Sequence, residues 1–328
     1  MQDAKQQDGN LVVRSDNVVE PSLPHSVALH GAQGKFAWEE YFSAHIRNTH
    51  TRAAYLRAVK AFLAWIEPIE PRLASITPGM VGHYFDQLDA LSAPSKKLHM
   101  SAIRGFFNVL VVRHLILLNP ALSVKTERFS VLEGKTPEIS VDQARKLLRS
   151  IDVTDAASAR DKAIIGVLIY TAARAGAIAK LKIKDLVDDG LQFSIRFNEK
   201  GGKHRNIPVR HDLQGLLQDY MRRAVLLEDA KDSPLFRSAI GRSGKLTDKR
   251  ITAVDICRLV KRKLKGAELP LTVSPHSFRS CAATDLLLQG VALEDVQYLL
   301  GHSDARVTRL YDRRQRVVTR NTVERISV

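Results

Sequence analysis

Three short motifs organise the last third of the chain: Ser274-Pro-His-Ser-Phe-Arg279, Leu300-Gly-His-Ser303 and Leu310-Tyr-Asp312. The Ser-Pro pair that opens the first motif predicts a helix start, with serine as N-cap and proline at the first helical position. His276 and Arg279 are three residues apart, so they share one face of the first turns of that helix. A helix N-terminus is also a natural phosphate site, because its amide groups and its dipole are positive.

The second and third motifs each lie at a helix end. The pattern predicts an apolar helix over 292–300, stopped by a glycine that aims His302 outward. A further helix over 304–310 brings Tyr311 to its end. Taken alone, each of these residues has an ordinary structural explanation, since a histidine after glycine is usually a cap and a tyrosine at a helix end usually packs.

The charge of the chain favours a polyanionic partner. The 328 residues carry a formal net charge of +15, and the part after residue 130 has 36 Lys and Arg against 24 Asp and Glu. A positive field of this size suits nucleic acid, whose phosphates supply most sequence-independent affinity. The alternative is a basic protein whose charge serves only solubility.

Several function classes find no support in the sequence. Cys257 and Cys281 form no CxxC pair and no zinc-ligand spacing, so we expect neither a disulfide framework nor a metal site. The polar N-terminus does not resemble a signal peptide, and no apolar run reaches the roughly 18 residues of a membrane span. We therefore expect a cytoplasmic protein without a membrane partner, metal or cofactor.

Changes in composition along the chain predict two domains with flanking segments. The expected segments are a flexible lead-in (1–34), a strand-free helical domain (35–125), a linker (126–139), a second domain (140–314) and a C-terminal tail (315–328). The alternative for 1–34 is a short ordered arm that docks elsewhere. A capping-box pattern from Ser140 to Gln143 predicts that the second domain begins with a helix.

The helical domain combines apolar stripes with basic residues. Thr77 followed by Pro78 predicts a helix start, and helices are also expected over 51–66 and 95–114. Its aromatic stripes are expected to form the core. Five basic residues are candidates for a DNA-facing surface, although any one of them could be a solvated charge: Arg52, Arg57, Lys96, Lys97 and Arg104.

The second domain supplies further candidates before the three motifs. A strongly apolar helix over 158–172 delivers Arg174, whose charge needs a partner, either a bound phosphate or a carboxylate. Two alternating runs, 191–196 and 205–209, predict a β-hairpin with a basic, glycine-rich tip. The helix expected over 252–265 is very basic and could contact phosphates through residues such as Arg258 and Arg262.

Taken together, these motifs resemble the tyrosine recombinases of the phage integrase family. The resemblance implies six catalytic residues, all present here in order: Arg174, Lys200, His276, Arg279, His302 and Tyr311. The family's hairpin pattern Gly-Lys-Gly-x-Lys-x-Arg overlays residues 199–205, so Lys200 is assigned and Lys203, also expected near DNA, is the alternative. The chain departs from the family pattern at Ala172, where glycine is usual, and at Ala177, where an acid often stands.

The residue types suit phosphodiester chemistry. Two guanidiniums, Arg174 and Arg279, can clamp phosphoryl oxygens bidentately. A tyrosine hydroxyl is mostly protonated near neutral pH, so Tyr311 as nucleophile needs a positive field and a base, for which His276 is the better candidate. The resemblance implies that His302 donates a hydrogen bond to the phosphate and that Lys200 protonates the departing 5′-hydroxyl. It also implies a 3′-phosphotyrosyl intermediate formed without metal or ATP.

The resemblance also implies the architecture and partners. The fold expected is mainly α with a small β-hairpin sheet (α+β), in which a helical DNA-binding domain and a catalytic domain form a C-shaped clamp around DNA. Partners are double-stranded DNA at short inverted core sites and three further copies of the chain, a homo-tetramer that exchanges strands through a Holliday junction, with the tail docked on a neighbouring protomer. The alternatives are a type IB topoisomerase and a DNA-binding protein that has lost catalysis.

Overall fold

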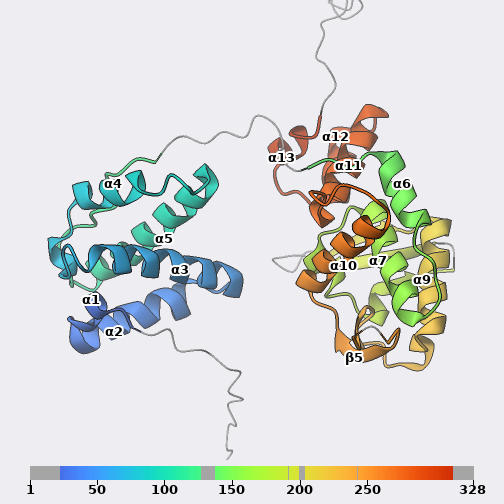
Figure 1. Cartoon of the computed structure of the whole chain (residues 1–328), viewed down its shortest axis with the longest axis horizontal. Coiled ribbons are helices and arrows are strands. Elements are labelled where there is room, and N and C mark those ends of the chain that lie inside the picture. The colour runs from blue at the N-terminus through green and yellow to red at the C-terminus, as the bar shows by residue number, and fades with distance from the viewer. Residues whose placement is uncertain (1–22, 127–136, 191, 199–203, 242, 313–328) are drawn as a thin grey trace, which may run out of the picture. The chain divides into compact units, whose positions relative to one another are not determined.

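The computed structural model describes residues 23–126, 137–190, 192–198, 204–241 and 243–312. It divides into two compact units, residues 1–130 and 131–328 (Figure 1). Each unit has its own hydrophobic core. The chain is helix-rich with small antiparallel sheets, as the sequence predicts.

The first unit is entirely helical in the part that the structure describes. Its helices are α1 (His25–Ala28), α2 (Gly31–Glu39), α3 (Thr49–Ile66), α4 (Pro78–Asp86) and α5 (Ala93–Val112). Aromatic rings fill its core: the ring centroid of Trp38 lies 4.6 Å from that of Phe42 and 5.5 Å from that of Phe106, in edge-on contacts. The hydroxyl of Thr77 caps α4 by accepting a hydrogen bond from the Met80 amide, as predicted.

The described end of the expected lead-in is ordered. Residues 23–34 contain α1 and the start of α2 instead of a flexible segment. Val27 is buried in the core, and the amide and hydroxyl of Ser26 both donate to the Glu67 carboxylate at the end of α3. These contacts bind the segment to the domain, which is closer to the docked-arm alternative. The prediction of a flexible segment was wrong for these residues, because the contacts of Val27 and Ser26 with the domain leave no pattern in a mostly polar sequence.

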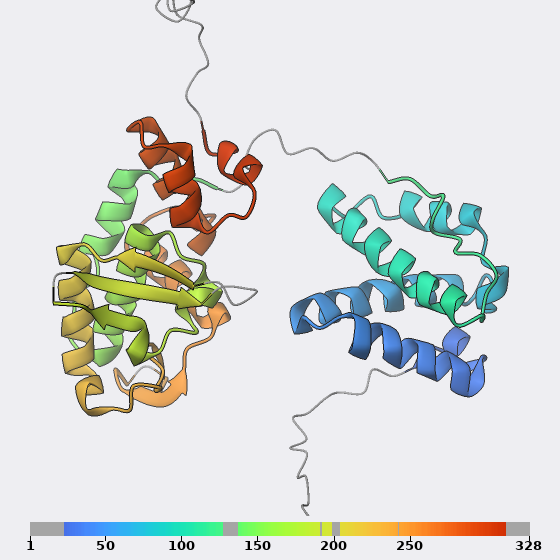
Figure 2. The same cartoon turned by 180° about the vertical axis from the view of Figure 1, so that it is seen from behind.

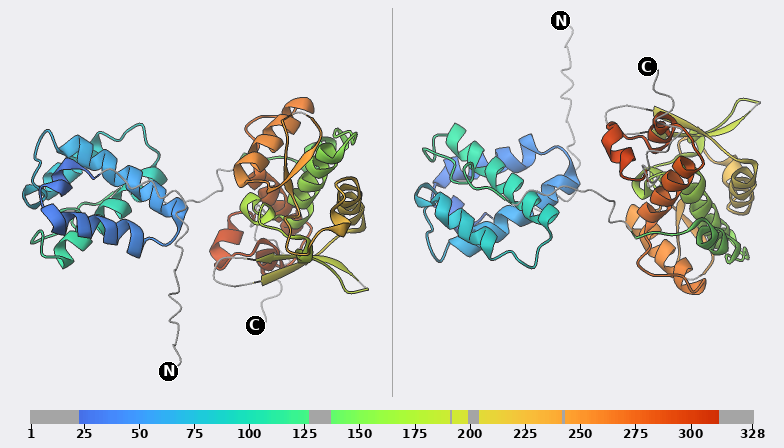
Figure 3. Two further views of the ribbon diagram at one scale, coloured as in Figure 1. Left: turned by 90° about the horizontal axis from the view of Figure 1, so that it is seen from below. Right: turned by 90° about the horizontal axis from the view of Figure 1, so that it is seen from above.

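The second unit carries the remaining elements. Its helices are α6 (Val141–Arg149), α7 (Ala156–Thr171), α8 (Ala175–Ile178), α9 (His211–Arg223), α10 (Ala253–Gly266), α11 (Pro275–Leu288), α12 (Leu293–Leu300) and α13 (Ala305–Arg309). Its strands are β1 (Leu186–Asp188), β2 (Phe193–Asn198), β3 (His204–Pro208), β4 (Arg237–Ala239) and β5 (Leu246–Arg250). Strands β1, β2 and β3 form an antiparallel sheet in that order, which lies along one side of the helices (Figures 2 and 3).

The predicted hairpin is present as β2 and β3, in a register that pairs Phe197 with Arg205. Three of the described strands were not predicted from the sequence. Strand β1 extends the hairpin sheet, and β4 and β5 form a second antiparallel pair. Short strands rich in charged residues show no apolar alternation, so the period-two pattern is missing from the sequence.

Capping boxes fix helix starts in this unit, among them those of α6 and α7. The hydroxyl of Ser140 accepts from the Gln143 amide, and the Gln143 side chain accepts from the Ser140 amide, as the sequence predicts. Asp155 caps α7 in the same way through Ser158. Helix α7 is apolar around most of its circumference and lies at the centre of the unit, where α9 and α11 pack against it.

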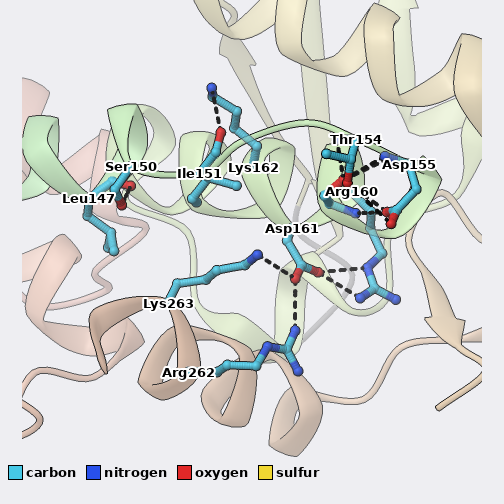
Figure 4. Close-up of polar contacts among 11 residues, drawn as sticks. Leu147, Ser150, Ile151, Thr154, Asp155, Arg160, Asp161, Lys162, Arg262 and Lys263 are labelled. Carbon is cyan, nitrogen blue, oxygen red and sulfur yellow. Dashed lines mark hydrogen bonds and ion pairs between the residues drawn. The ribbon is translucent and has the colours of Figure 1, made fainter. Parts of the chain in front are cut away.

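A buried ion cluster joins the start of α7 to α10 (Figure 4). The Asp161 carboxylate is 3% exposed and pairs with Arg160 at 2.7 Å, Arg262 at 2.8 Å and Lys263 at 3.3 Å. The Arg160 guanidinium is also buried and donates to the Arg237 carbonyl oxygen at 2.6 Å. Removing one partner of such a pair leaves an uncompensated buried charge.

We expect Asp161→Ala to lower the free energy of unfolding by about 3 to 5 kcal/mol, because Arg160 then stays buried without its carboxylate. Urea unfolding of the full chain measures the change. The matched control is Asp142→Ala, which removes an exposed pair with Arg145 and costs at most about 0.5 kcal/mol. Equal losses in the two variants would show that the buried cluster has no special role.

Candidate active site

Arg279 lies at the centre of the candidate site. Its side chain is 1% exposed, and its guanidinium bonds to two backbone carbonyl groups from different helices. Nη1 donates to the oxygen of Ala172, the C-cap of α7, at 2.8 Å, and Nη2 donates to the oxygen of Leu300, the last residue of α12. Helix C-termini have unsatisfied carbonyls and a negative dipole, so a buried cation is stabilised there.

This link sets the positions of two other candidates. Arg174 follows Ala172 by two residues, and His302 follows Leu300 by two residues. Both side chains line one groove of about 940 Å³. The groove also takes residues from the hairpin and from α12, and the full lining is Arg174, Gly176, Ala177, Lys180, Asn198, His204, Arg205, Glu294, Gln297, Tyr298, Gly301, His302 and Ser303.

The glycine before His302 ends α12 in a Schellman motif. Gly301 has a left-handed backbone with φ of 60°. Its amide donates to the Tyr298 oxygen at 2.9 Å, and the His302 amide donates to the Gln297 oxygen at 3.1 Å. The Gln297 side chain also donates to the His302 carbonyl at 3.0 Å. These bonds hold His302 from both sides of its backbone, at the position that the glycine signal predicts.

Tyr311 lies beside His302. Their ring planes are nearly parallel, 12° apart, with centroids 6.1 Å apart. Tyr311 is 9% exposed and packs in a small apolar cluster that also contains Leu287, Val296 and Leu300. Nδ1 of His302 forms a hydrogen bond of 2.9 Å with the Thr308 hydroxyl. The predicted nucleophile is therefore adjacent to the predicted phosphate-binding histidine.

Both histidines of the site favour the neutral form. Burial lowers the pKa of His302 to about 4, and the charges of Arg279 and Arg174 act in the same direction. The charge of Arg205 adds to this effect, as does that of His276 when it is protonated. Partial burial also lowers the pKa of His276, again assisted by the charges of Arg279 and Arg174. An imidazole that is neutral at pH 7 can accept a proton.

The structure brings five of the six catalytic candidates together: Arg174, His276, Arg279, His302 and Tyr311. Lys200 and its alternative Lys203 lie outside the described residues. The described ends of the hairpin do reach the groove, because Asn198 and His204 line it. At the position of the missing acid, Ala177 also lines the groove, and its amide donates to the Arg174 carbonyl at 2.8 Å.

The described basic residues that were predicted to face DNA divide into three groups. Arg57 and Lys97 are exposed, whereas Arg52 donates to the Ile46 carbonyl and Arg104 to the carbonyls of Ala121 and Val124. The other three side chains each have an acidic partner: Lys96 pairs with Asp89, Arg258 with Asp255 and Arg262 with Asp161. The half-buried Arg104 thus stabilises the fold of its own domain.

Sequence reasoning missed two residues of the site. Arg205 is buried on β3, with its guanidinium 5.3 Å from the Phe197 ring centroid, and it lines the groove. Thr308 is fully buried against His302. The period-two alternation of the hairpin would have placed Arg205 on the same face as Ile207, which is the buried face. Thr308 carries no such signal, because a threonine on a short polar helix is unremarkable in the sequence.

Comparisons with known proteins agree with this geometry. Residues 138–316 match the phage integrase family, and residues 37–114 match the phage integrase N-terminal SAM-like domain. Tyrosine recombinase XerD of Chlorobaculum tepidum is 31% identical over 273 residues, which are 80% of this chain and 85% of the relative. Tyrosine recombinase XerD of Pseudomonas putida is 29% identical over 268 residues, 80% of this chain and 86% of the relative.

Solved structures share the fold. The XerH site-specific recombinase bound to a palindromic difH substrate, a post-cleavage complex, has a TM-score of 0.67 at 18% identity and covers 92% of this chain and 95% of its own. A lambda integrase dimer bound to a COC′ core site has a TM-score of 0.65 at 17% identity, with coverage of 88% and 79%.

The two domains and the set of cations, histidines and tyrosine define a DNA strand-transfer enzyme of the tyrosine class. The chain belongs to the phage integrase family. It is a site-specific tyrosine recombinase, and this favours recombination over the topoisomerase and catalytically impaired alternatives. In the described part of the chain, no helix has the length and apolar character needed to span a membrane.

We expect Gly301→Ala to destabilise the protein by about 1 kcal/mol, because an alanine is strained in the left-handed conformation that ends α12. Urea unfolding measures this change. In the control Gly215→Ala, the added Cβ points into open space in the middle of α9, so helix propensity should stabilise the protein by about 0.5 to 1 kcal/mol. Changes of the same sign in both variants would contradict the strain argument.

The lowered pKa of His302 predicts a pH dependence of stability. Between pH 6.5 and 4 the unfolded chain binds a proton at this imidazole and the folded chain does not, so stability falls as pH falls. We expect wild type to lose about 2 kcal/mol more than His302→Gln over this range, less than the full shift implies because water screens the half-buried ring. Unfolding measured at several pH values gives the difference, and a constant difference would contradict the assignment.

Proposed function

We propose that this chain cuts one DNA strand by attack of the Tyr311 hydroxyl on the scissile phosphate held between Arg174 and Arg279. The observation that carries the proposal is the bond of Arg279 to the ends of α7 and α12, which brings Arg174 and His302 to one groove beside Tyr311. A guanidinium suits this role because it binds phosphate oxygens through charge-assisted hydrogen bonds.

The chemistry then divides among named groups. His276 accepts the proton of the Tyr311 hydroxyl as the tyrosyl oxygen bonds to phosphorus, and its lowered pKa keeps it in the basic form. The 5′-oxygen leaves and takes a proton from Lys200, or from Lys203 as the alternative. His302 donates a hydrogen bond to a non-bridging oxygen. The 3′-phosphotyrosyl ester conserves the bond energy, so a 5′-hydroxyl of the partner strand can reverse the step.

The buried position of Tyr311 implies a movement during the reaction. Its ring is stacked against His302, and it is not among the side chains that line the groove. We propose that the ring turns toward the groove when a phosphate occupies it. The move gives up part of the apolar contact with Leu287 and Leu300. Binding of DNA would supply the free energy for this exchange.

The proposed substrate is double-stranded DNA with short inverted core sites. Exposed Arg57 and Lys97 are the candidates for phosphate contacts from the helical domain. Four protomers would hold two sites, and the predicted docking of residues 315–328 on a neighbouring protomer falls outside the described residues. A lambda integrase tetramer bound to a Holliday junction shares the fold, at a TM-score of 0.64 and 16% identity, which supports this assembly. Integration, excision and resolution all fit this mechanism.

A nicked suicide substrate tests the nucleophile. Wild type should accumulate a covalent protein–DNA adduct, visible on a denaturing gel, and Tyr311→Phe should form none because it lacks the attacking oxygen. The control is Tyr298→Phe, since Tyr298 is exposed, lines the groove and is the rival nucleophile nearest in sequence. This variant should form the adduct.

An adduct that persists in Tyr311→Phe and disappears in Tyr298→Phe would reassign the nucleophile. No adduct with wild type on its own target site would contradict the proposed chemistry. A second assay separates recombination from topoisomerase action: plasmids with one site and with two sites are compared. Recombinant products should require two sites, whereas relaxation of a plasmid of any sequence would favour the topoisomerase alternative.

A further inference from the structure

The Thr308 hydroxyl is placed to control His302. Thr308 lies on α13, its side chain is fully buried, and its Oγ1 is 2.9 Å from Nδ1 of His302. Its carbonyl oxygen accepts the Tyr311 amide hydrogen at 3.0 Å. One residue thus contacts the imidazole through its side chain and the nucleophile through its backbone.

We propose that Thr308 is a positioning residue that donates its hydroxyl hydrogen to Nδ1 of His302 and thereby keeps the imidazole proton on Nε2, toward the groove. This inference rests on the proposed function, because it takes the groove to be the phosphate site. In that site, the Thr308 hydroxyl decides which nitrogen of His302 can donate a hydrogen bond to the phosphate.

The direction of the hydrogen bond follows from the number of protons available. A neutral imidazole has one N–H and one lone pair, whereas a hydroxyl can either donate or accept. A pKa of about 4 means that His302 holds a single proton near pH 7. If that proton were on Nδ1, the lone pair of Nε2 would face the phosphate oxygens and repel them. With the proton on Nε2, Nδ1 must accept, and Thr308 supplies the donor.

The charged groups around His302 also favour an imidazole with a single proton. The charges that act on its pKa are those of Arg174 before α8, Arg205 on β3, and His276 and Arg279 on α11, and the Tyr311 ring is stacked beside it. None of these is an anion that would stabilise a second imidazole proton. The ring therefore stays neutral, and its tautomer is left to the hydrogen bond with Thr308.

The geometry of the pair is fixed on both sides. The backbone of His302 is held by the Schellman motif and by the Gln297 side chain. Thr308 is β-branched, so it has few rotamers in a helix. A helical threonine commonly bonds to the carbonyl four residues earlier, as the Thr171 hydroxyl does with Val167 at 2.7 Å. In the described structure, the Thr308 hydroxyl bonds to His302 instead.

The first test needs no DNA. Nitrogen-15 NMR of the full chain labelled at histidine reports which ring nitrogen is protonated, and His302→Gln assigns the signal. We expect the proton on Nε2 in wild type and in Thr308→Ser, and a mixture of tautomers in Thr308→Val, which keeps the shape and loses the hydroxyl. A proton on Nδ1 in wild type, or no change of tautomer in Thr308→Val, would overturn the proposal.

The second test measures the rate of covalent adduct formation on the nicked substrate. Thr308→Val should react about tenfold more slowly than wild type, the size expected for one lost hydrogen bond, with unchanged DNA affinity. Thr308→Ser should restore the rate. The matched control Thr171→Val removes an equally buried hydroxyl bonded only within α7 and should react like wild type.

The outcomes distinguish the proposed role of Thr308 from the proposed chemistry of strand cutting. Wild-type rates in Thr308→Val, or an equal loss in Thr171→Val, would overturn the role of Thr308 while the nucleophile stands. Absence of any adduct in wild type would overturn the proposed chemistry, and the tautomer measurement would still decide whether Thr308 directs the proton of His302.

Discussion

The structure of the site depends on one buried guanidinium between two helix ends. Arg279 donates to the carbonyl groups that terminate α7 and α12, at helix ends where carbonyls have no partner within the helix. A lysine in its place would present a single ammonium, whereas the planar guanidinium reaches two acceptors in different directions. Because Arg174 and His302 each follow one of these helix ends by two residues, the same bond that stabilises the fold also sets the spacing of the site.

The end of α7 shows how a departure from the family pattern is accommodated. Ala172 has a left-handed backbone with φ of 50°, where glycine would avoid a strain of about 1 kcal/mol. Its methyl group is fully buried in the cluster with Leu287 and Tyr311. Burial of one methyl contributes about 0.8 kcal/mol, so the gain in packing roughly offsets the strain. At Ala177, where the family pattern often has an acid, a methyl group lines the groove instead.

The sequence predicted the features that depend on interactions between neighbouring residues, such as helix starts and helix ends. The helix starts after Thr77, Ser140 and Ser274 and the glycine stop before His302 are all present, because each depends on a few neighbouring residues. The convergence of Arg174 with His302 was accessible only through the family resemblance, since the bond that creates it joins residues over 100 positions apart. Thr308 was inaccessible for the same reason: its role exists only after α13 has packed against His302.

The distribution of charge explains why the site combines arginines with histidines. Arg174 and Arg279 stay charged at every physiological pH, so the positive field at the groove does not vary. That field, together with burial, lowers the pKa of both His276 and His302 and keeps them neutral. Fixed charge and transferable protons are thus assigned to different side chains. A site built from lysines and histidines would couple the two, because each lysine could lose its charge when buried. The arginine pair therefore lets the histidines exchange protons while the electrostatic attraction for phosphate remains constant.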